Sequence, residues 1–132
     1  QYVANTAKEV VGIDSVEEGI KAAYKNAERN NINNCSFYTG DMKEIFTDGF
    51  IEQNGNPDVI ITDPPRDGMH KKVVEQILKI GPKRVVYVSC NSATQARDLS
   101  LIDRMYKVTQ LQALDMFPQT QHVENIVVLD KR

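Results

Sequence analysis

Four short apolar runs, separated by segments with helical spacing, constrain this fold more than any other feature of the chain. The runs are Val10–Ile13, Cys35–Thr39, Val59–Thr62 and Val85–Ser89, and each is predicted as a buried strand. Strands that are joined through single helices pair in parallel, with right-handed crossovers. The sequence therefore predicts an α/β fold built on a mostly parallel sheet.

A polar or reactive residue follows each of these predicted strands. The four are Asp14, Asp41, Asp63 and Cys90, which lie 27, 22 and 27 residues apart. The carboxyl ends of parallel strands meet at one edge of a sheet, where open α/β sheets bind ligands. We therefore expect these four side chains to line one rim.

The end of the chain departs from this alternation. Segments 106–114 and 123–130 are both predicted as strands, and the stretch between them is too short for a parallel crossover. An antiparallel hairpin is therefore expected, with its turn at the rim that carries Cys90. Glu124, near the start of the returning strand, then faces the same crevice.

The predicted helices carry recognisable end signals. Ser15–Glu18 and Ser92–Gln95 each place a Ser three residues before a Glu or Gln, which predicts a capping box at a helix start. One continuous helix is expected over about 42–53. A further helix is expected to contain Val73 to Ile80, and Gly81 and Pro82 predict its end.

Bulk properties set outer limits on the function. The 132 residues fit one domain spanning 1–132, and the net charge of −2 is unlike that of a chain held to nucleic acid mainly through phosphates. Either the partner is not a polyanion, or its main contacts lie elsewhere. Cys35 and Cys90 lack metal-ligand spacing and a disulfide framework, so we expect no metal and a reducing, cytoplasmic compartment.

No targeting or membrane segment is recognisable in the sequence. It contains no signal peptide and no apolar run long enough to span a bilayer. Residues 1–7 read as the tail of a helix and lack an initiator Met. The chain is therefore expected to be a piece of a longer protein.

The first two carboxylates each allow two interpretations. Asp14 stands between a strand and a helix, where an acid can accept hydrogen bonds from the ribose hydroxyls of a nucleoside cofactor. Asp41 follows Gly40 at the next strand end and could accept from an adenine amino group. Either residue could instead be a plain helix cap. The residues alone leave both interpretations open.

The segment Asp63–Arg66, with the sequence Asp-Pro-Pro-Arg, is more specific. Two prolines fix the backbone and remove two donors at the point where a strand should stop. The result is a rigid lip that holds a carboxylate and a guanidinium close together. This pattern favours a functional lip over a simple turn.

Cys90 is the candidate nucleophile because it lies between a strand end and a helix start, where a thiolate is favoured. A core cysteine is the alternative, and that interpretation suits Cys35, which opens an apolar strand. Glu124 could act as a general base at the crevice. Taken in isolation, it fits a solvated strand end better.

Four stretches occur in an order and at a spacing that are specific to one protein family: residues 63–66, 87–91, 114–120 and 122–124. Together they resemble the RNA uracil-5 methyltransferase family, which uses S-adenosylmethionine to form 5-methyluridine in tRNA or rRNA. The resemblance covers nearly the whole chain. It implies a Rossmann-like class I methyltransferase fold and an RNA partner.

The resemblance also implies roles for the candidate residues. Cys90 matches the nucleophile of the family and Glu124 its proton-abstracting base. Asp14, Asp41 and Asp63 match positions that contact the cofactor. A thiolate that adds to carbon 6 of uracil makes carbon 5 nucleophilic, which is the activation that this methyl transfer needs.

Two departures from the family pattern stand out. Ser92 occupies a position where members often have Pro, and both residues suit the start of a helix. The first strand of the family fold and its Gly-rich cofactor loop have no counterpart in this sequence. We therefore expect weak cofactor binding and little turnover from the chain alone.

Two other functions compete with this interpretation. Amino-group methyltransferases of nucleic acids use a similar Asp-Pro-Pro lip, but they usually place an aromatic residue where Arg66 stands, and they leave Cys90 unexplained. A non-catalytic, degenerate Rossmann-like fragment could serve as a folding or interaction module.

Overall fold

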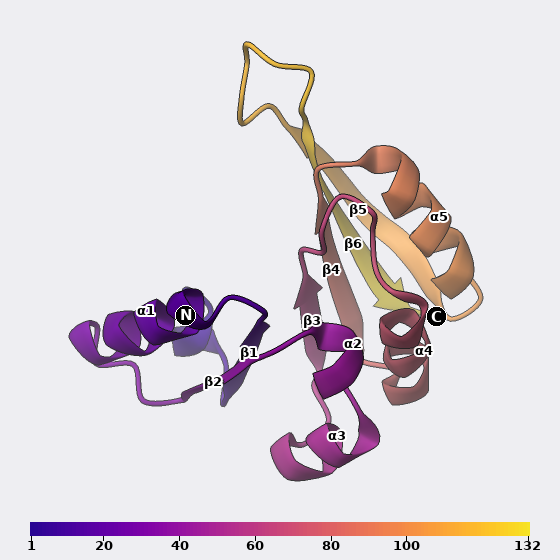
Figure 1. The fold of residues 1–132 in the computed structure, drawn as a ribbon. Helices are drawn as coiled ribbons and strands as arrows, with labels where there is room; N and C mark the ends of the chain where they lie inside the picture. Colours follow the sequence, from indigo (N-terminus) through magenta and orange to yellow (C-terminus); the bar gives the residue numbers. More distant parts are fainter. The chain divides into compact units, whose positions relative to one another are not determined.

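The computed structural model describes all of residues 1–132 and divides them into two compact units, Gln1–Asn54 and Gly55–Arg132. Each unit contains its own sheet, with two strands in the first and four in the second (Figure 1). None of the helices has both the length and the apolar character needed to cross a membrane.

The first unit is a strand–helix–strand element with short helices at either end. Its two strands pair in parallel over their full length, from Val10 opposite Cys35 to Asp14 opposite Thr39. In chain order its elements are η1 (Ala4–Thr6), β1 (Val10–Asp14), α1 (Glu17–Arg29), β2 (Cys35–Thr39), α2 (Met42–Ile45) and α3 (Asp48–Asn54).

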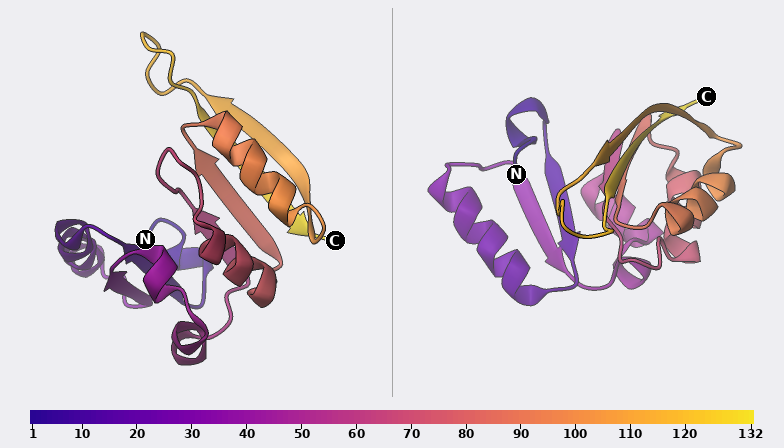
Figure 2. Two further views of the ribbon diagram at one scale, coloured as in Figure 1. Left: turned by 45° about the vertical axis from the view of Figure 1, so that its right-hand side comes forward. Right: turned by 90° about the horizontal axis from the view of Figure 1, so that it is seen from above.

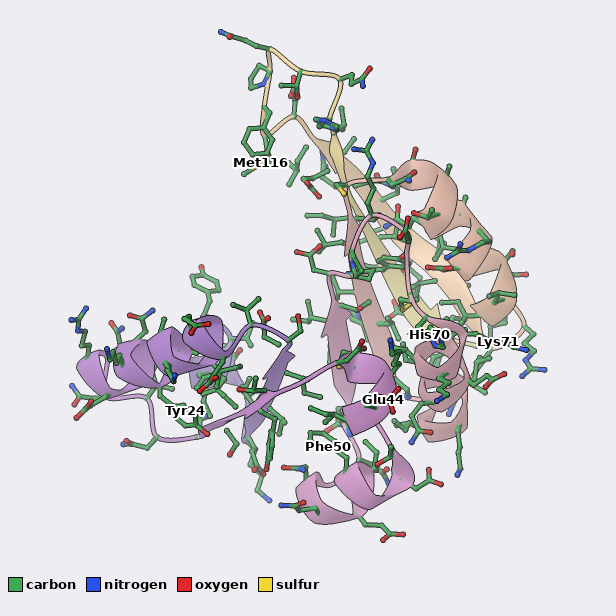
Figure 3. The ribbon with its side chains drawn as sticks, in the orientation of Figure 1. Tyr24, Glu44, Phe50, His70, Lys71 and Met116 are labelled. Carbon is green, nitrogen blue, oxygen red and sulfur yellow. The ribbon has the colours of Figure 1, made fainter.

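Helix α1 packs against its two strands through a mixed apolar and polar contact. Ile20 and Ala27 are the buried residues of its inner face. Tyr24, labelled on α1 in Figure 3, meets Phe37 of β2 edge to face, with ring centroids 5.0 Å apart. The Tyr24 hydroxyl also donates to the Phe37 carbonyl at 3.0 Å, so the helix is fixed to the strand by both.

The second unit holds a mixed sheet in the order β3-β4-β6-β5. The β3–β4 pair is parallel, whereas β6 runs antiparallel to both β4 and β5. The predicted C-terminal hairpin is thus confirmed. Its elements are β3 (Val59–Thr62), α4 (Lys71–Ile80), β4 (Arg84–Ser89), α5 (Ser92–Ile102), β5 (Tyr106–Leu114) and β6 (Glu124–Lys131).

The core of the second unit lies between its sheet and the helices α4 and α5 (Figure 2). Strand β4 alternates, with Val85 and Tyr87 fully buried on the face toward the helices. Ile77 of α4 and Ile102 of α5 are equally buried. Each such aliphatic side chain stabilises the fold by about 1.5–3 kcal/mol relative to an exposed one.

The predicted helix over 42–53 is wrong, because the structure has two helices there. Helix α2 ends at Ile45, and Phe46 adopts a non-helical backbone while its side chain is buried. Helix α3 begins only at Asp48. Burial of one aromatic ring thus outweighs the continuous helical pattern. The opening residues form only a three-residue 3₁₀ turn, Ala4–Thr6, instead of a helix tail.

Both predicted capping boxes are also wrong. Val16, and not Ser15, stands at the cap position of α1, and no side chain caps that helix. At α5 the cap is Asn91, whose side chain accepts from the amides of Ala93 and Thr94. Asn caps a helix as well as Ser does, and Asn91 stands one residue before the predicted cap, Ser92.

The predicted α/β fold is confirmed, with parallel strands joined through helices and an antiparallel hairpin at the end. The strands form two sheets instead of one, and two of the four strand pairs are parallel. Strand β1 pairs only with β2, and β3 pairs only with β4. The sheets are separate because no strand of this chain pairs with the remaining edge of β1 or of β3.

Candidate active site

The first unit brings Asp14 and Asp41 to the carboxyl ends of β1 and β2. The Gly40 amide donates to the Asp14 carbonyl at 2.9 Å, which holds the two strand ends together. One carboxylate oxygen of Asp14 accepts from the Val16 amide at 2.8 Å. Both acids are exposed to solvent. The structure therefore groups these two of the four residues that the sequence predicted for one rim, while Asp63 and Cys90 belong to the second unit.

Both carboxylate oxygens of Asp41 contact Lys43, the residue two positions further along the chain. Asp41 caps α2 by accepting from the Lys43 amide at 3.0 Å, and its other oxygen lies 3.0 Å from the Lys43 ammonium. The hydrogen bond and charge of Asp41 raise the pKa of Lys43 above its ordinary value. The capping role considered for Asp41 is thus real in the structure.

These two carboxylates still fit a nucleoside ligand. An ionised carboxylate has about four acceptor positions, and the hydrogen bond from the Val16 amide engages one of those of Asp14. Exposed oxygens at the ends of parallel strands can accept from the hydroxyl or amino groups of such a ligand. These acceptors suit neutral donors such as ribose hydroxyls.

The second unit places Asp63, Cys90 and Glu124 at one end of its sheet. Asp63 directly follows β3, Cys90 directly follows β4, and Glu124 begins β6. Ser89 pairs with Asn125, so Glu124 and Cys90 both lie just past the end of the same strand pairing. The strand register therefore places these three residues at the same end of the sheet, as the sequence predicted.

Asp63 and Glu124 share a hollow of about 340 Å³ at this end of the sheet. The hairpin loop between β5 and β6 forms one wall, and Met116 is labelled on that loop in Figure 3. Cys90, which is half-buried, lies outside the lining. The lining residues are Asp63, Val88, Leu114, Met116, Phe117, Glu124 and Ile126.

The backbone around Cys90 is fixed by its two neighbours. The Ser89 hydroxyl donates to the Asn91 carbonyl at 3.0 Å, and the Asn91 amide donates back to that hydroxyl at 3.1 Å. Asn91 then caps α5. The thiol thus stands in a turn that is fixed on both sides, directly before the start of a helix.

The lip at 63–66 is tied to the start of α5. Asn91 donates through its side chain to the Arg66 carbonyl at 3.2 Å, and the Thr94 hydroxyl donates to the same oxygen at 3.0 Å. Arg97 reaches the next carbonyl, that of Asp67, at 2.8 Å. The helix that follows the thiol therefore also holds the lip.

A buried carboxylate, Asp98, completes this attachment. Asp98 is fully buried and accepts from the Met69 amide and the Tyr87 hydroxyl, both at 2.7 Å. Arg97 pairs with its other oxygen at 2.7 Å. Burial, and then the hydrogen bond to Asp98, raise the pKa of Tyr87 well above its ordinary value. The charge of Asp98 thus has three partners that compensate its burial.

The backbone just after the lip, at Gly68, fits closely around this carboxylate. Gly68 adopts a φ of +84°, and a Cβ added there would come within 2.6 Å of the Asp98 carboxylate. Only glycine suits both the conformation and the space.

The sequence prediction missed four residues of this site, namely Asn91, Thr94, Gln95 and Asp98. They are the cap residue of α5 and the residues three, four and seven positions after it, which is the spacing of one helix face. A polar face on a helix that follows a reactive residue was the available signal. It was not used because a polar helix face is ordinarily exposed to solvent.

The fold defines the class of this protein. An rRNA methylase from Streptococcus thermophilus matches it with a TM-score of 0.72 at 16% identity, over 98% of this chain and 77% of that one. A dimethyladenosine transferase from Plasmodium falciparum gives a TM-score of 0.72 at 19% identity, over 96% and 49%. At these identities the likeness concerns the fold alone, which is an α/β methyltransferase fold.

The sequence narrows this class to one family. The profile of the tRNA (uracil-5-)-methyltransferase family matches residues 2–132, and the chain belongs to that family. An uncharacterised RNA methyltransferase of Bacteroides thetaiotaomicron is 59% identical over 99% of this chain. The tRNA (uracil-54, C5)-methyltransferase of Pyrococcus abyssi, solved with S-adenosyl-L-homocysteine, is 39% identical over 97% of this chain, with a TM-score of 0.82.

These relatives are much longer than the chain. It covers 29% of the Bacteroides protein and 30% of the Pyrococcus chain. It spans less than a third of the length of the curated relatives that it matches. The chain therefore corresponds to one part of each of these proteins.

Proposed function

We propose that the protein carrying this chain transfers a methyl group from S-adenosylmethionine to carbon 5 of a uridine in RNA. The observation that carries this proposal is that Cys90 and Glu124 lie together past one strand pairing, in a chain of the uracil-5 methyltransferase family. The first is suited to form a covalent bond, and the second to take up a proton.

The reaction begins at the thiol. The Cys90 thiolate adds to carbon 6 of the uracil ring, which forms a carbon–sulfur bond and makes carbon 5 nucleophilic. S-adenosylmethionine supplies an electrophilic methyl group when it is bound. Carbon 5 takes this methyl group, and S-adenosylhomocysteine is the product that leaves.

The second half of the reaction needs a base. The adduct still carries a hydrogen on carbon 5, and the Glu124 carboxylate takes this proton. The electrons of the broken carbon–hydrogen bond form the carbon 5–carbon 6 double bond as the carbon–sulfur bond breaks. The electrons of that bond leave with the thiolate, and the methylated uridine is released.

The three aspartates are proposed as cofactor contacts. Asp14 and Asp41 are exposed acceptors at the ends of parallel strands, where ribose hydroxyls or an amino group can donate to them. Asp63 lies in the hollow that also contains Glu124, so it would stand near the transferred group.

An RNA substrate, tRNA or rRNA, is proposed as the partner. The name of the Pyrococcus relative supports tRNA. A uracil must leave its base stack before a thiolate can reach carbon 6, so we expect a loop or an unstacked position as the target. The reaction is proposed to take place in the cytoplasm.

The covalent step can be tested in the full-length protein with tRNA and rRNA transcripts that contain 5-fluorouridine. Fluorine on carbon 5 cannot leave as a proton does, so the adduct accumulates and is visible on a denaturing gel. We expect an adduct that depends on S-adenosylmethionine and is absent in Cys90→Ala. Cys35→Ala is the matched control, since it removes the other thiol. Persistence of the adduct in Cys90→Ala excludes Cys90 as the nucleophile.

The base can be tested separately with ordinary uridine transcripts. In Glu124→Gln we expect methyl transfer to proceed while release of the RNA slows by roughly 10²- to 10⁴-fold. Methylated RNA should then remain attached to the protein on a denaturing gel. Normal release from this variant removes Glu124 from the mechanism. Methylation of an amino group instead of carbon 5, detected by mass spectrometry of the nucleosides, contradicts the whole proposal.

A further inference from the structure

The strand that begins with Glu124 is held by one buried side chain of α5. Gln95 is 1% exposed, and its amide nitrogen donates to the Tyr87 carbonyl at 3.0 Å and to the Asn125 carbonyl at 3.1 Å. The Asn125 side chain donates back to the Gln95 carbonyl oxygen at 2.5 Å. Gln95 thus contacts β4 and β6 at the same time.

This arrangement uses every hydrogen-bonding atom of the Gln95 side chain. Both amide hydrogens and the carbonyl oxygen have a partner, so the amide is compatible with burial. An unpaired amide in that place would destabilise the fold, because a buried polar group without a partner loses its hydrogen bonds to water. A Met or Leu of similar volume would fill the same space without any such requirement, so packing alone does not call for a glutamine.

The partners of Gln95 are placed where geometry matters for the proposed reaction. Asn125 is the residue next to Glu124, and Tyr87 lies on the strand that leads to Cys90. Gln95 itself sits one turn into the helix that begins just after Cys90. One side chain therefore links the segment that carries the thiol to the segment that carries the carboxylate.

We infer that Gln95 is a positioning residue for Glu124, and that it serves the removal of the carbon 5 proton more than the formation of the adduct. This inference rests on the proposed function. Adduct formation needs the thiolate, which the turn of Ser89 and Asn91 holds independently of Gln95. Proton removal needs the carboxylate at a fixed distance from carbon 5, and that distance depends on where β6 begins. A misplacement of about 1 Å can slow such a step by about 100-fold.

The test separates these two steps in the full-length protein. Adduct formation is followed with a 5-fluorouridine transcript, and proton removal is followed as release of tritium from carbon 5 of an ordinary uridine transcript. In Gln95→Met, which keeps the length of the side chain but none of its hydrogen bonds, we expect tritium release to fall by about 10- to 100-fold. Adduct formation should change by less than about 3-fold.

A second variant tests the same contact from the other strand. Asn125→Ala removes the hydrogen bond to Gln95 from the less buried partner, and we expect the same separation of steps. Because Gln95→Met already removes the side-chain contact with Asn125 together with the two backbone contacts of Gln95, the double variant should be no slower than Gln95→Met alone. If Gln95→Met does not fold, the result for Asn125→Ala decides the question.

Tyr106→Phe is the matched control for a lost buried hydrogen bond. Tyr106 is fully buried and donates to the Pro82 carbonyl at 2.8 Å, and it opens β5 at the opposite end of the sheet. We expect this variant to lower stability without slowing either step.

Three results would overturn the inference. Equal slowing of both steps in Gln95→Met gives Gln95 a general structural role, and strict additivity in the double variant means that the two residues act separately. The absence of any adduct with the unaltered protein overturns the proposed function itself and the inference with it.

Discussion

The two units hold their candidate site residues in opposite ways. In the first unit, Asp14 and Asp41 bond to amides only two residues further along the chain. In the second unit, the residues around Asp63, Cys90 and Glu124 are joined by hydrogen bonds that span 25 to 30 residues. The first arrangement is local, and the second depends on the tertiary fold.

The two arrangements suit different requirements for the position of a side chain. A carboxylate that accepts hydrogen bonds from a ligand needs only to stand at a strand end, where a local turn is enough to orient it. A thiol, a lip and a base that act on one ring must be fixed relative to each other. Helix α5 does this because its inner face is polar.

The largest loss of stability is expected from Asp98→Ala. This change leaves the Tyr87 hydroxyl and the Met69 amide without their buried acceptor. We expect the free energy of unfolding of the full-length protein to fall by about 3–5 kcal/mol, as measured by urea denaturation. Asp103→Ala removes an exposed ion pair with Arg132 and is the control, with a loss under about 1 kcal/mol. Similar losses in both variants would mean that the buried network is unimportant.

The second largest loss of stability is expected from Gly68→Ala, and Gly55→Ala is its control. The two glycines have nearly the same φ, +84° and +83°, but only at Gly68 would a Cβ meet other atoms. The left-handed conformation costs both variants about 1–3 kcal/mol. Gly68→Ala should lose more, because the methyl group displaces Asp98, and urea denaturation measures the difference. Equal losses would show that the lip tolerates the added methyl group.

A smaller effect, with a distinct pH dependence, is expected from Tyr87→Phe. At neutral pH the variant loses one hydrogen bond to Asp98, which we expect to cost about 1.5–3 kcal/mol. The folded protein raises the pKa of Tyr87, so this stabilisation is complete below the ordinary value of 10.0 and is lost as pH rises through the raised value.

The pH series is measured as the difference between the two proteins. The unaltered protein should lose stability more steeply than Tyr87→Phe above pH 10, so their unfolding free energies should converge. A constant difference across that range would contradict the role given to the Tyr87 hydroxyl.

The smallest effect on stability is expected from Asp14→Ala. The lost contact is one local hydrogen bond to the Val16 amide, worth about 0.5–1 kcal/mol. Binding of S-adenosylhomocysteine, measured by calorimetry on the full-length protein, should nevertheless weaken by at least about 10-fold, the equivalent of one charged hydrogen bond. Asp14→Gly should weaken binding by a similar factor, because the change to glycine also removes the acceptor. Unchanged affinity would leave Asp14 with its local role alone.

The strands could be predicted from the sequence because each is an apolar run that ends in a polar residue. Cys35–Thr39 and Val59–Thr62 are strands over the predicted residues. The helix starts were harder, since Asn91 and Ser92 are adjacent and both are good caps. The break at Phe46 depends on a ring that is buried by the rest of the unit, which the helical pattern of 42–53 does not encode.

The candidate residues at strand ends could be predicted, but their supports could not. Asp63, Cys90 and Glu124 stand out because each follows or opens an apolar run. Gln95 and Asp98 have ordinary helical spacing, and their importance lies in partners that are about 30 residues away. Such partners are defined by the register of β4 against β6 and by the packing of α5, and neither is visible in a local pattern.

The span of the α5 contacts has a consequence for folding kinetics. Closing a loop of 25 to 30 residues costs more entropy than forming a turn, and contacts between distant residues slow folding. The first unit can complete the Asp14 and Asp41 turns as soon as its strand ends form. Cys90, the lip and Glu124 of the second unit are joined only when α5 docks on β4 and β6, so this arrangement should form among the last events of refolding.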